Sequence, residues 1–98
     1  MWTPCRNAVV PDTGIYTVYA YASEESGDAV VDDKIREFQV TVNGSSIFSG
    51  STTGHYYWRW TGSRTLALTK GEKIELSVQQ RSGGNRTVYT ELTYQRIL

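Results

Sequence analysis

The residues that could do chemistry are few, and they lie far apart in the sequence. His55 is the only histidine and Cys5 the only cysteine in a chain of 98 residues. Neither a Gly-x-Ser-x-Gly nucleophile motif nor the ligand spacing of a metal site accompanies His55. A cysteine near a terminus, with no base beside it in the sequence, predicts an unreactive thiol rather than a nucleophile. We therefore expect no enzymatic activity and no cofactor.

Acidic residues gather in one segment between two expected strands. They are Glu24, Glu25, Asp28, Asp32 and Asp33. A hard cation such as calcium needs several oxygen ligands, but the spacing here does not match an EF-hand ligand loop. We interpret the segment as a solvated loop that holds no metal.

Aromatic residues gather at positions 55–60, which read His-Tyr-Tyr-Trp-Arg-Trp. In a strand, alternation puts Tyr56, Trp58 and Trp60 on one face and the other three residues on the opposite face. One face must then contribute to the core, while the other is a candidate contact patch, because Tyr, Trp and Arg dominate interface hot spots. Partner contact, pure packing and stacking on a sugar ring stay open. The candidate contact residues are Trp2, Tyr57, Trp58, Arg59 and Trp60.

Length and charge limit the classes of protein to which this chain can belong. The chain has room for one domain, and a domain this small is often stabilised by oligomerisation. Ten basic and ten acidic residues balance, which argues against a nucleic-acid partner. No long apolar run predicts a membrane span, and no charged segment followed by an apolar one at the N-terminus predicts a signal peptide.

The hydrophobic pattern has a period of two nearly throughout, which predicts an all-β domain. We expect strands at 15–22, 35–42, 46–49, 56–60, 65–68, 74–79 and 88–98, with loops at 24–33, 50–54 and 81–86. Asn43-Gly44 is the strongest hairpin signal, because both residues tolerate positive φ. Short strands with turn signals between them favour a sandwich or a jelly roll.

The strand at 15–22 is apolar on both faces. Tyr16, Val18, Ala20 and Ala22 share one face, and Ile15, Thr17, Tyr19 and Tyr21 share the other. A sandwich strand buries one face and exposes the other to water. The second face is therefore either a set of exposed tyrosines or an interface between chains.

Several segments, taken in order, are similar to one known superfamily. Residues 10–16, Val-Pro-Asp-Thr-Gly-Ile-Tyr, resemble the opening of the first long strand in the tumour necrosis factor and complement globular-head superfamily. Residues 40–44, Val-Thr-Val-Asn-Gly, resemble its central strand and hairpin, and residues 66–76 resemble its Leu-x-Leu, turn, Gly-acidic-x-apolar-x-Leu segment. Residues 80–84, Gln-Arg-Ser-Gly-Gly, with Thr87-Val88 resemble variants in tailed-phage virion proteins.

This resemblance implies a compact jelly-roll sandwich that forms a homotrimer. The family packs the face of Ile15, Thr17, Tyr19 and Tyr21 against the threefold axis, with Tyr19 in the place of an axial aromatic. Some relatives bind calcium through acidic loops. The family also has more strand material before this segment, so we expect residues 1–9 to form an N-terminal arm, with Trp2 anchored on another chain.

The resemblance implies a non-enzymatic structural and binding module on a phage virion surface. A chain that begins at Met1 without a stalk favours a small stand-alone capsid decoration or tail-tip protein, with itself and other virion proteins as partners. One alternative is the tip of a tail fibre that binds a carbohydrate or receptor, such as a cell-surface glycan. A less favoured alternative is an extracellular cytokine-like ligand.

Overall fold

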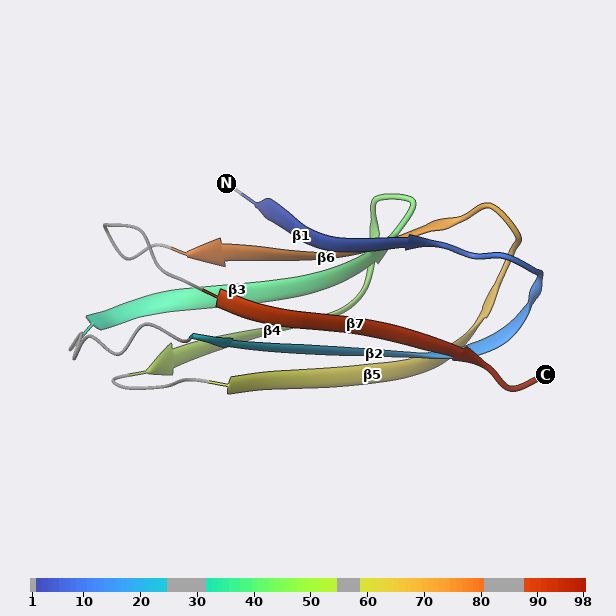
Figure 1. Ribbon diagram of the computed structural model, residues 1–98. Coiled ribbons are helices and arrows are strands. Elements are labelled where there is room, and N and C mark those ends of the chain that lie inside the picture. Colours follow the sequence, from blue (N-terminus) through green and yellow to red (C-terminus); the bar gives the residue numbers. More distant parts are fainter. Residues whose placement is uncertain (1, 25–31, 55–58, 81–87) are drawn as a thin grey trace.

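The computed structural model describes residues 2–24, 32–54, 59–80 and 88–98, and these residues form strands and turns. The strands are β1 (Thr3–Val9), β2 (Gly14–Glu24), β3 (Asp32–Val42), β4 (Ser45–Gly54), β5 (Arg59–Leu68), β6 (Lys73–Gln80) and β7 (Val88–Arg96). They make two antiparallel sheets, which we call sheet A (β1-β6-β3-β4) and sheet B (β5-β2-β7) (Figure 1). The expected all-β class is confirmed, and the arrangement is that of a β-sandwich.

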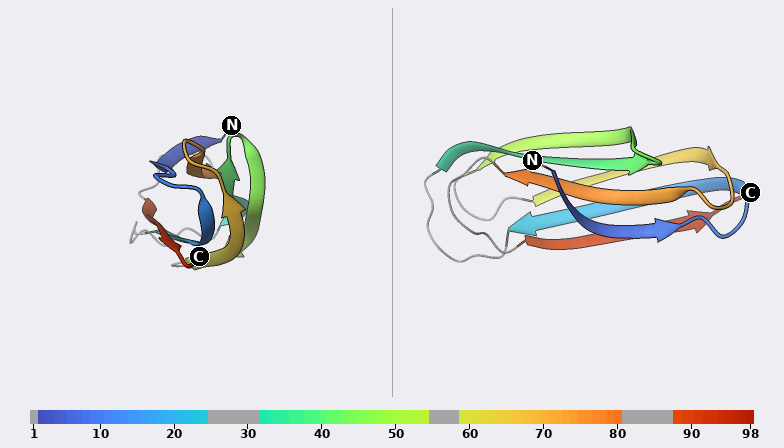
Figure 2. Two further views of the ribbon diagram at one scale, coloured as in Figure 1. Left: turned by 90° about the vertical axis from the view of Figure 1, so that its right-hand side faces the viewer. Right: turned by 90° about the horizontal axis from the view of Figure 1, so that it is seen from above.

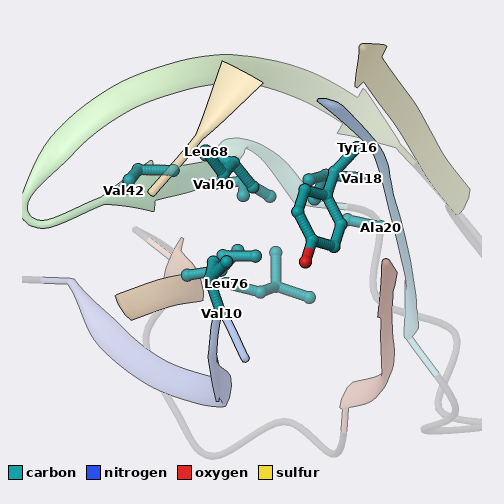
Figure 3. Close-up of a cluster of buried hydrophobic side chains, with 9 residues drawn as sticks. Val10, Tyr16, Val18, Ala20, Val40, Val42, Leu68 and Leu76 are labelled. Carbon is teal, nitrogen blue, oxygen red and sulfur yellow. The ribbon is translucent and has the colours of Figure 1, made fainter. Parts of the chain in front are cut away.

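The core lies between the two sheets, and strand alternation fills it. From β2, Tyr16, Val18 and Ala20 are each at most 2% exposed. Figure 3 shows these side chains pointing toward partners from sheet A and from the loops. The fully buried members from sheet A are Phe38, Val40, Ile74 and Leu76. The face of Tyr16, Val18, Ala20 and Ala22, which the sequence predicts for the strand at 15–22, is therefore confirmed as the inner one.

Seen end-on, the strands form a flattened ring (Figure 2, left). On one side of the ring β4 lies beside β5, and Arg64 Nη1 donates a hydrogen bond to the carbonyl oxygen of Ile47 at 2.9 Å. On the other side β1 lies beside β7, and Arg6 Nε donates to Thr90 Oγ1 at 3.2 Å. Neither neighbouring pair forms a backbone ladder, so β1, β4, β5 and β7 are the sheet edges.

The predicted Asn43-Gly44 hairpin is confirmed. Asn43 has φ 48° and Gly44 has φ 86°, as the turns that match strand twist require. Asn43 Oδ1 also accepts a hydrogen bond from the backbone amide of Lys73 at 2.9 Å. The turn that pairs β3 with β4 is thereby also fixed to β6.

The N-terminal segment is a strand and not the predicted arm. Residues 3–9 form β1, which pairs with β6 from Thr3 opposite Val78 to Val9 opposite Lys73. The register shifts between Pro4 and Arg6. Proline is tolerated at an edge strand or a bulge, because its missing N–H is not needed there. Pro4 therefore does not prevent the pairing of β1 with β6.

Two further boundaries differ from the expectation. The segment at 50–54, predicted as a loop, continues β4 to Gly54, and the two short strands predicted at 56–60 and 65–68 are replaced by β5. Glycine is required in β4 because a side chain at Gly50 would overlap the ring of Trp60. Gly62 of β5 similarly lies against the Phe48 ring. These glycines admit aromatic rings between the sheets.

Candidate interaction surfaces

The predicted interface residues all lie on the outer face of sheet B, at its centre. Ile15, Thr17, Tyr19 and Tyr21 alternate with the buried residues of β2, which has a neighbour on each side. Because cross-strand partners share a face, residues of β5 and β7 extend this surface. We call this surface the tyrosine face. Its further members are Thr61, Ser63, Thr65 and Ala67 from β5 and Tyr89, Glu91, Thr93 and Gln95 from β7.

Aromatic and hydroxyl contacts hold the side chains of the tyrosine face in place. The rings of Tyr21 and Tyr89 meet edge to face with centroids 5.9 Å apart. Thr17 Oγ1 and Thr65 Oγ1 lie 3.0 Å apart in a hydrogen bond across β2 and β5. A shallow depression of about 390 Å³ is lined by Thr17, Tyr19, Thr93, Tyr94 and Gln95. The surface therefore offers apolar rings surrounded by hydroxyl groups, a composition suited to protein contact.

The outer face of sheet A has a different composition. Its exposed residues on β6 begin with Lys73 and Glu75, whose Nζ and Oε2 atoms lie 3.2 Å apart in an ion pair. Gln39 of β3 faces Ser49 of β4 on the same surface. A charged and hydroxyl-rich sheet face is an ordinary solvent-facing surface. The contrast between the sheets singles out the tyrosine face.

Trp2 lies on sheet A of its own chain. It lines a hollow of about 430 Å³ together with residues of β3 and β4, which are Glu37, Phe38, Gln39, Ser49, Gly50 and Ser51. Because β6 lies between β1 and β3, the indole extends over β6. Ser77 of β6 is accordingly only 3% exposed, although it alternates with core residues. Within the single chain, the predicted anchor thus lies against sheet A, and its contact with another chain stays a prediction.

The other predicted contact residues are separated by the fold. Trp60 is half-buried and packs against the core, where its ring stacks on Phe38 at 5.2 Å and on Phe48 at 5.9 Å between centroids. Arg59 faces Ser23 across β5 and β2 and is exposed at one end of the tyrosine face. Tyr57 and Trp58, like His55, fall outside the described residues. The assignment of Trp60 to a contact patch is therefore corrected, and Arg59 joins the predicted interface.

One member of the tyrosine face, Tyr89, was not identified from the sequence. Tyr89 is 45% exposed, and its hydroxyl donates to Glu91 Oε1 at 2.5 Å. This acceptor raises the pKa of Tyr89 above its ordinary value, because ionisation would lose the hydrogen bond. The sequence does contain a signal for this membership, because Tyr89, Glu91 and Thr93 alternate with Thr90 and Leu92 and therefore share one face of the strand.

Cys5 should react slowly with thiol reagents. Partial burial raises the pKa of its thiol, and the Arg6 charge and a backbone hydrogen bond at Val78 offset only part of this shift. Because the thiolate is the nucleophile, we expect iodoacetamide at pH 8 to alkylate the folded protein several-fold more slowly than a cysteine peptide. Unfolding in urea should restore the rate. A folded protein that reacts as fast as the peptide would contradict this expectation.

Comparison with known proteins identifies no relative. No protein-family model matches the chain, and no curated protein does. The resemblance to the tumour necrosis factor and complement globular-head superfamily therefore stays a prediction. In the part of the chain that the structure describes, three or more acidic, histidine or cysteine side chains nowhere meet as a metal site would need. That part also contains no helix that could span a membrane.

Proposed function

We propose that this protein is a non-catalytic binding module that acts as a homotrimer through its tyrosine face. The observation that carries the proposal is the composition of that face. Ile15, Tyr19 and Tyr21 lie on the outer face of the central strand of sheet B, where solvent-facing strands ordinarily carry charges and polar groups. Tyr19 is 36% exposed, and the other two are half-buried. Trimerisation would remove these side chains from water and add buried area to a small domain.

The strand pairing supports a jelly roll within the β-sandwich. A jelly roll is a long antiparallel ribbon folded on itself, so that its pairs are nested in the sequence. Here β3 pairs with β4, β2 with β5 and β1 with β6. In an eight-stranded jelly roll, β7 would pair with one more strand that precedes β1. We therefore propose a jelly roll of seven strands.

The virion setting is proposed from the sequence resemblance alone. A capsid decoration protein or a tail-tip protein acts by covering or joining other virion proteins, and neither role needs a catalytic group. A small trimer with one polar sheet turned outward suits either role. Mass spectrometry of purified particles that contain this chain, with capsids separated from tails, would identify its position.

Sedimentation equilibrium tests the trimer directly. We expect the mass to rise with concentration toward a multiple of three chains, because the tyrosine face of each copy meets those of two others. A protein that stays monomeric at millimolar concentration, and shows no threefold contact in its assembly, would overturn the proposal.

The hollow beside Trp2 favours a second candidate function, the binding of a carbohydrate. Sugar rings stack on indoles, while their hydroxyl groups bond to amides and carboxylates. The side chain of Gln39 and the hydroxyls of Ser49 and Ser51 belong to the same hollow. This arrangement matches the predicted alternative of a glycan-binding tip, on sheet A and not on the tyrosine face.

If the hollow binds glycans, Trp2→Ala should weaken binding at least about tenfold, as the loss of an aromatic anchor does. Trp2→Phe should retain part of the affinity, since it keeps a ring. Ser46→Ala, an exposed change outside the hollow, is the control. A glycan array followed by titration calorimetry measures these effects. An array without a hit, or equal binding by Trp2→Ala, would exclude this candidate.

A further inference from the structure

Strand β7 forms an open edge of sheet B. It pairs with β2 along its length without a register shift, and no described strand forms a backbone ladder on its other side, where β1 of sheet A lies beside it. Edge strands are usually protected from pairing with another chain by proline, lysine, bulges or cover from a neighbouring segment. Strand β1 has Pro4 and a bulge, and Arg64 of β5 donates to a backbone carbonyl of β4. On β7, Arg6 of β1 instead donates to the side-chain hydroxyl of Thr90. The β7 sequence, Val-Tyr-Thr-Glu-Leu-Thr-Tyr-Gln-Arg, contains no proline or lysine.

Backbone groups of alternate β7 residues point to this open edge. The amide of Ile97 donates to the carbonyl oxygen of Ile15 at 2.7 Å. Because the direction of N–H and C=O groups alternates along a strand, Gln95 and Thr93 also point to β2. Tyr94, Leu92 and Thr90 then point away from it. Their unpaired groups are a template for another strand.

Apolar side chains gather along the same edge. The structure describes six exposed large apolar residues, and four belong to β7 or follow it: Tyr89, Tyr94, Ile97 and Leu98. Tyr94 is on the inner face of β7, since it is opposite Val18, yet 37% of it is exposed. A groove of about 360 Å³ runs between Arg6 and residues 89–93. The edge of the core is thus uncovered where a further strand would lie.

We propose that β7 pairs antiparallel with β7 of a second copy of this chain, which joins two copies of sheet B into one six-stranded sheet. A twofold interface must be self-complementary. With Thr93 at the twofold axis, Leu92 of each copy faces Tyr94 of the other, and Tyr89 faces Ile97. Glu91 then faces Gln95, so no like charges oppose one another along β7. The exposed apolar residues cover each other in this register.

This edge contact does not depend on the proposed trimer, although Tyr89, Glu91, Thr93 and Gln95 also belong to the tyrosine face. It involves the rim of sheet B, whereas the trimer involves its outer surface. A protein that uses both contacts would associate as pairs of trimers. The edge contact alone gives a dimer. Loss of the edge contact therefore halves the mass of the assembly, and loss of the face contact divides it by three.

Residue-resolved hydrogen exchange by NMR tests the pairing, because only alternate backbone amides of β7 point to the open edge. In dilute protein, amides of Thr90, Leu92 and Tyr94 should exchange fast, while those of Glu91 and Thr93 are protected by β2. At a concentration where nine-tenths of the chains are paired, exchange at Leu92 and Tyr94 should slow about tenfold. Unchanged exchange of these amides in the associated protein would overturn the proposal. So would their protection in the monomer, which would mean that the edge is already covered.

Tyr94→Lys is the matching variant, because an inward-pointing charge on an edge opposes strand addition. We expect it to weaken edge pairing at least about tenfold and to halve the mass in sedimentation equilibrium. Tyr94→Phe, which keeps the apolar ring, should associate as the wild type does. Circular dichroism checks that both variants fold, and if Tyr94→Lys does not, the exchange experiment on the wild type decides. Equal association by the two folded variants would contradict the proposal.

Discussion

Replacing Tyr19 by glutamate should dissociate the proposed homotrimer. Tyr19 lies on the central strand of sheet B, opposite Ser63 on one side and Thr93 on the other. A threefold contact through this face would gather three carboxylates in a poorly solvated space, where like charges repel. Loss of a central aromatic alone costs an interface about 2–4 kcal/mol. We expect association to weaken at least about 30-fold in sedimentation equilibrium.

The free energy of unfolding should change little in this variant, since Tyr19 is 36% exposed in the single chain. Ser49→Glu provides the matched control, because it adds the same charge to an exposed strand position on sheet A. That control should associate like the wild type. If Tyr19→Glu leaves the mass of the assembly unchanged, the interface lies elsewhere. If Ser49→Glu also dissociates the trimer, net charge and not position explains the result.

Replacing Trp60 by alanine should lower the free energy of unfolding by about 3–5 kcal/mol, the range for large aromatic side chains in cores. The indole contacts both buried clusters of the core, one centred on β2 and β6 and the other on Ala22 and Phe38. Its removal would leave a cavity between the two sheets. For a small domain such a loss is a large part of the total stability.

Chemical denaturation measures this change, and Arg59→Ala is the control. Arg59 precedes Trp60 on β5 but is exposed, so its replacement should change stability by less than about 0.5 kcal/mol. Trp60→Phe should recover part of the loss because a ring remains beside Phe48. Equal stability of Trp60→Ala and Arg59→Ala would mean that Trp60 is a surface residue, as the sequence analysis had allowed.

Strand alternation made the inner faces predictable. In β2, the buried residues Tyr16, Val18, Ala20 and Ala22 alternate with the tyrosine face, so period two separates core from surface up to Ala22. Ser23, only 3% exposed, departs from the pattern near the end of the strand. The hairpin at Asn43 and Gly44 was equally clear, because the dipeptide matches the backbone angles that the turn needs. These signals are local, and local signals can be read without knowing the fold.

Features that depend on distant residues were not predictable. Residues 3–9 have few apolar residues, and they form a strand because β6 provides a distant partner, as in the pairing of Asn7 with Glu75, 68 residues further along the chain. Gly50 looked like a loop residue, although it is in a strand to make room for Trp60. Propensity is overridden in both cases by tertiary contacts. The predicted strand boundaries are therefore wrong where packing between strands determines them.

The candidate surfaces were predictable in part. The face of Ile15 to Tyr21 follows from one strand, whereas its extension to Tyr89 and Arg59 needs the order of strands in sheet B. Trp2 was correctly singled out as a residue that needs cover, but the sequence could not say that its own sheet A lies beneath it. The open edge of β7 depends on which strands are neighbours.

The nested pairing has a consequence for the order in which the chain folds. The β3–β4 hairpin closes over two residues, and its closure brings β2 nearer to β5 and then β1 nearer to β6, so that each step lowers the loop entropy of the next. During synthesis, the strands that pair late in this order are the first to leave the ribosome. Strands β1 and β2 emerge first, yet β2 must await β5, and β1 must await β6, which ends at Gln80. During synthesis, the risk of aggregation therefore falls on the residues up to Glu24, whose apolar faces wait longest for a partner.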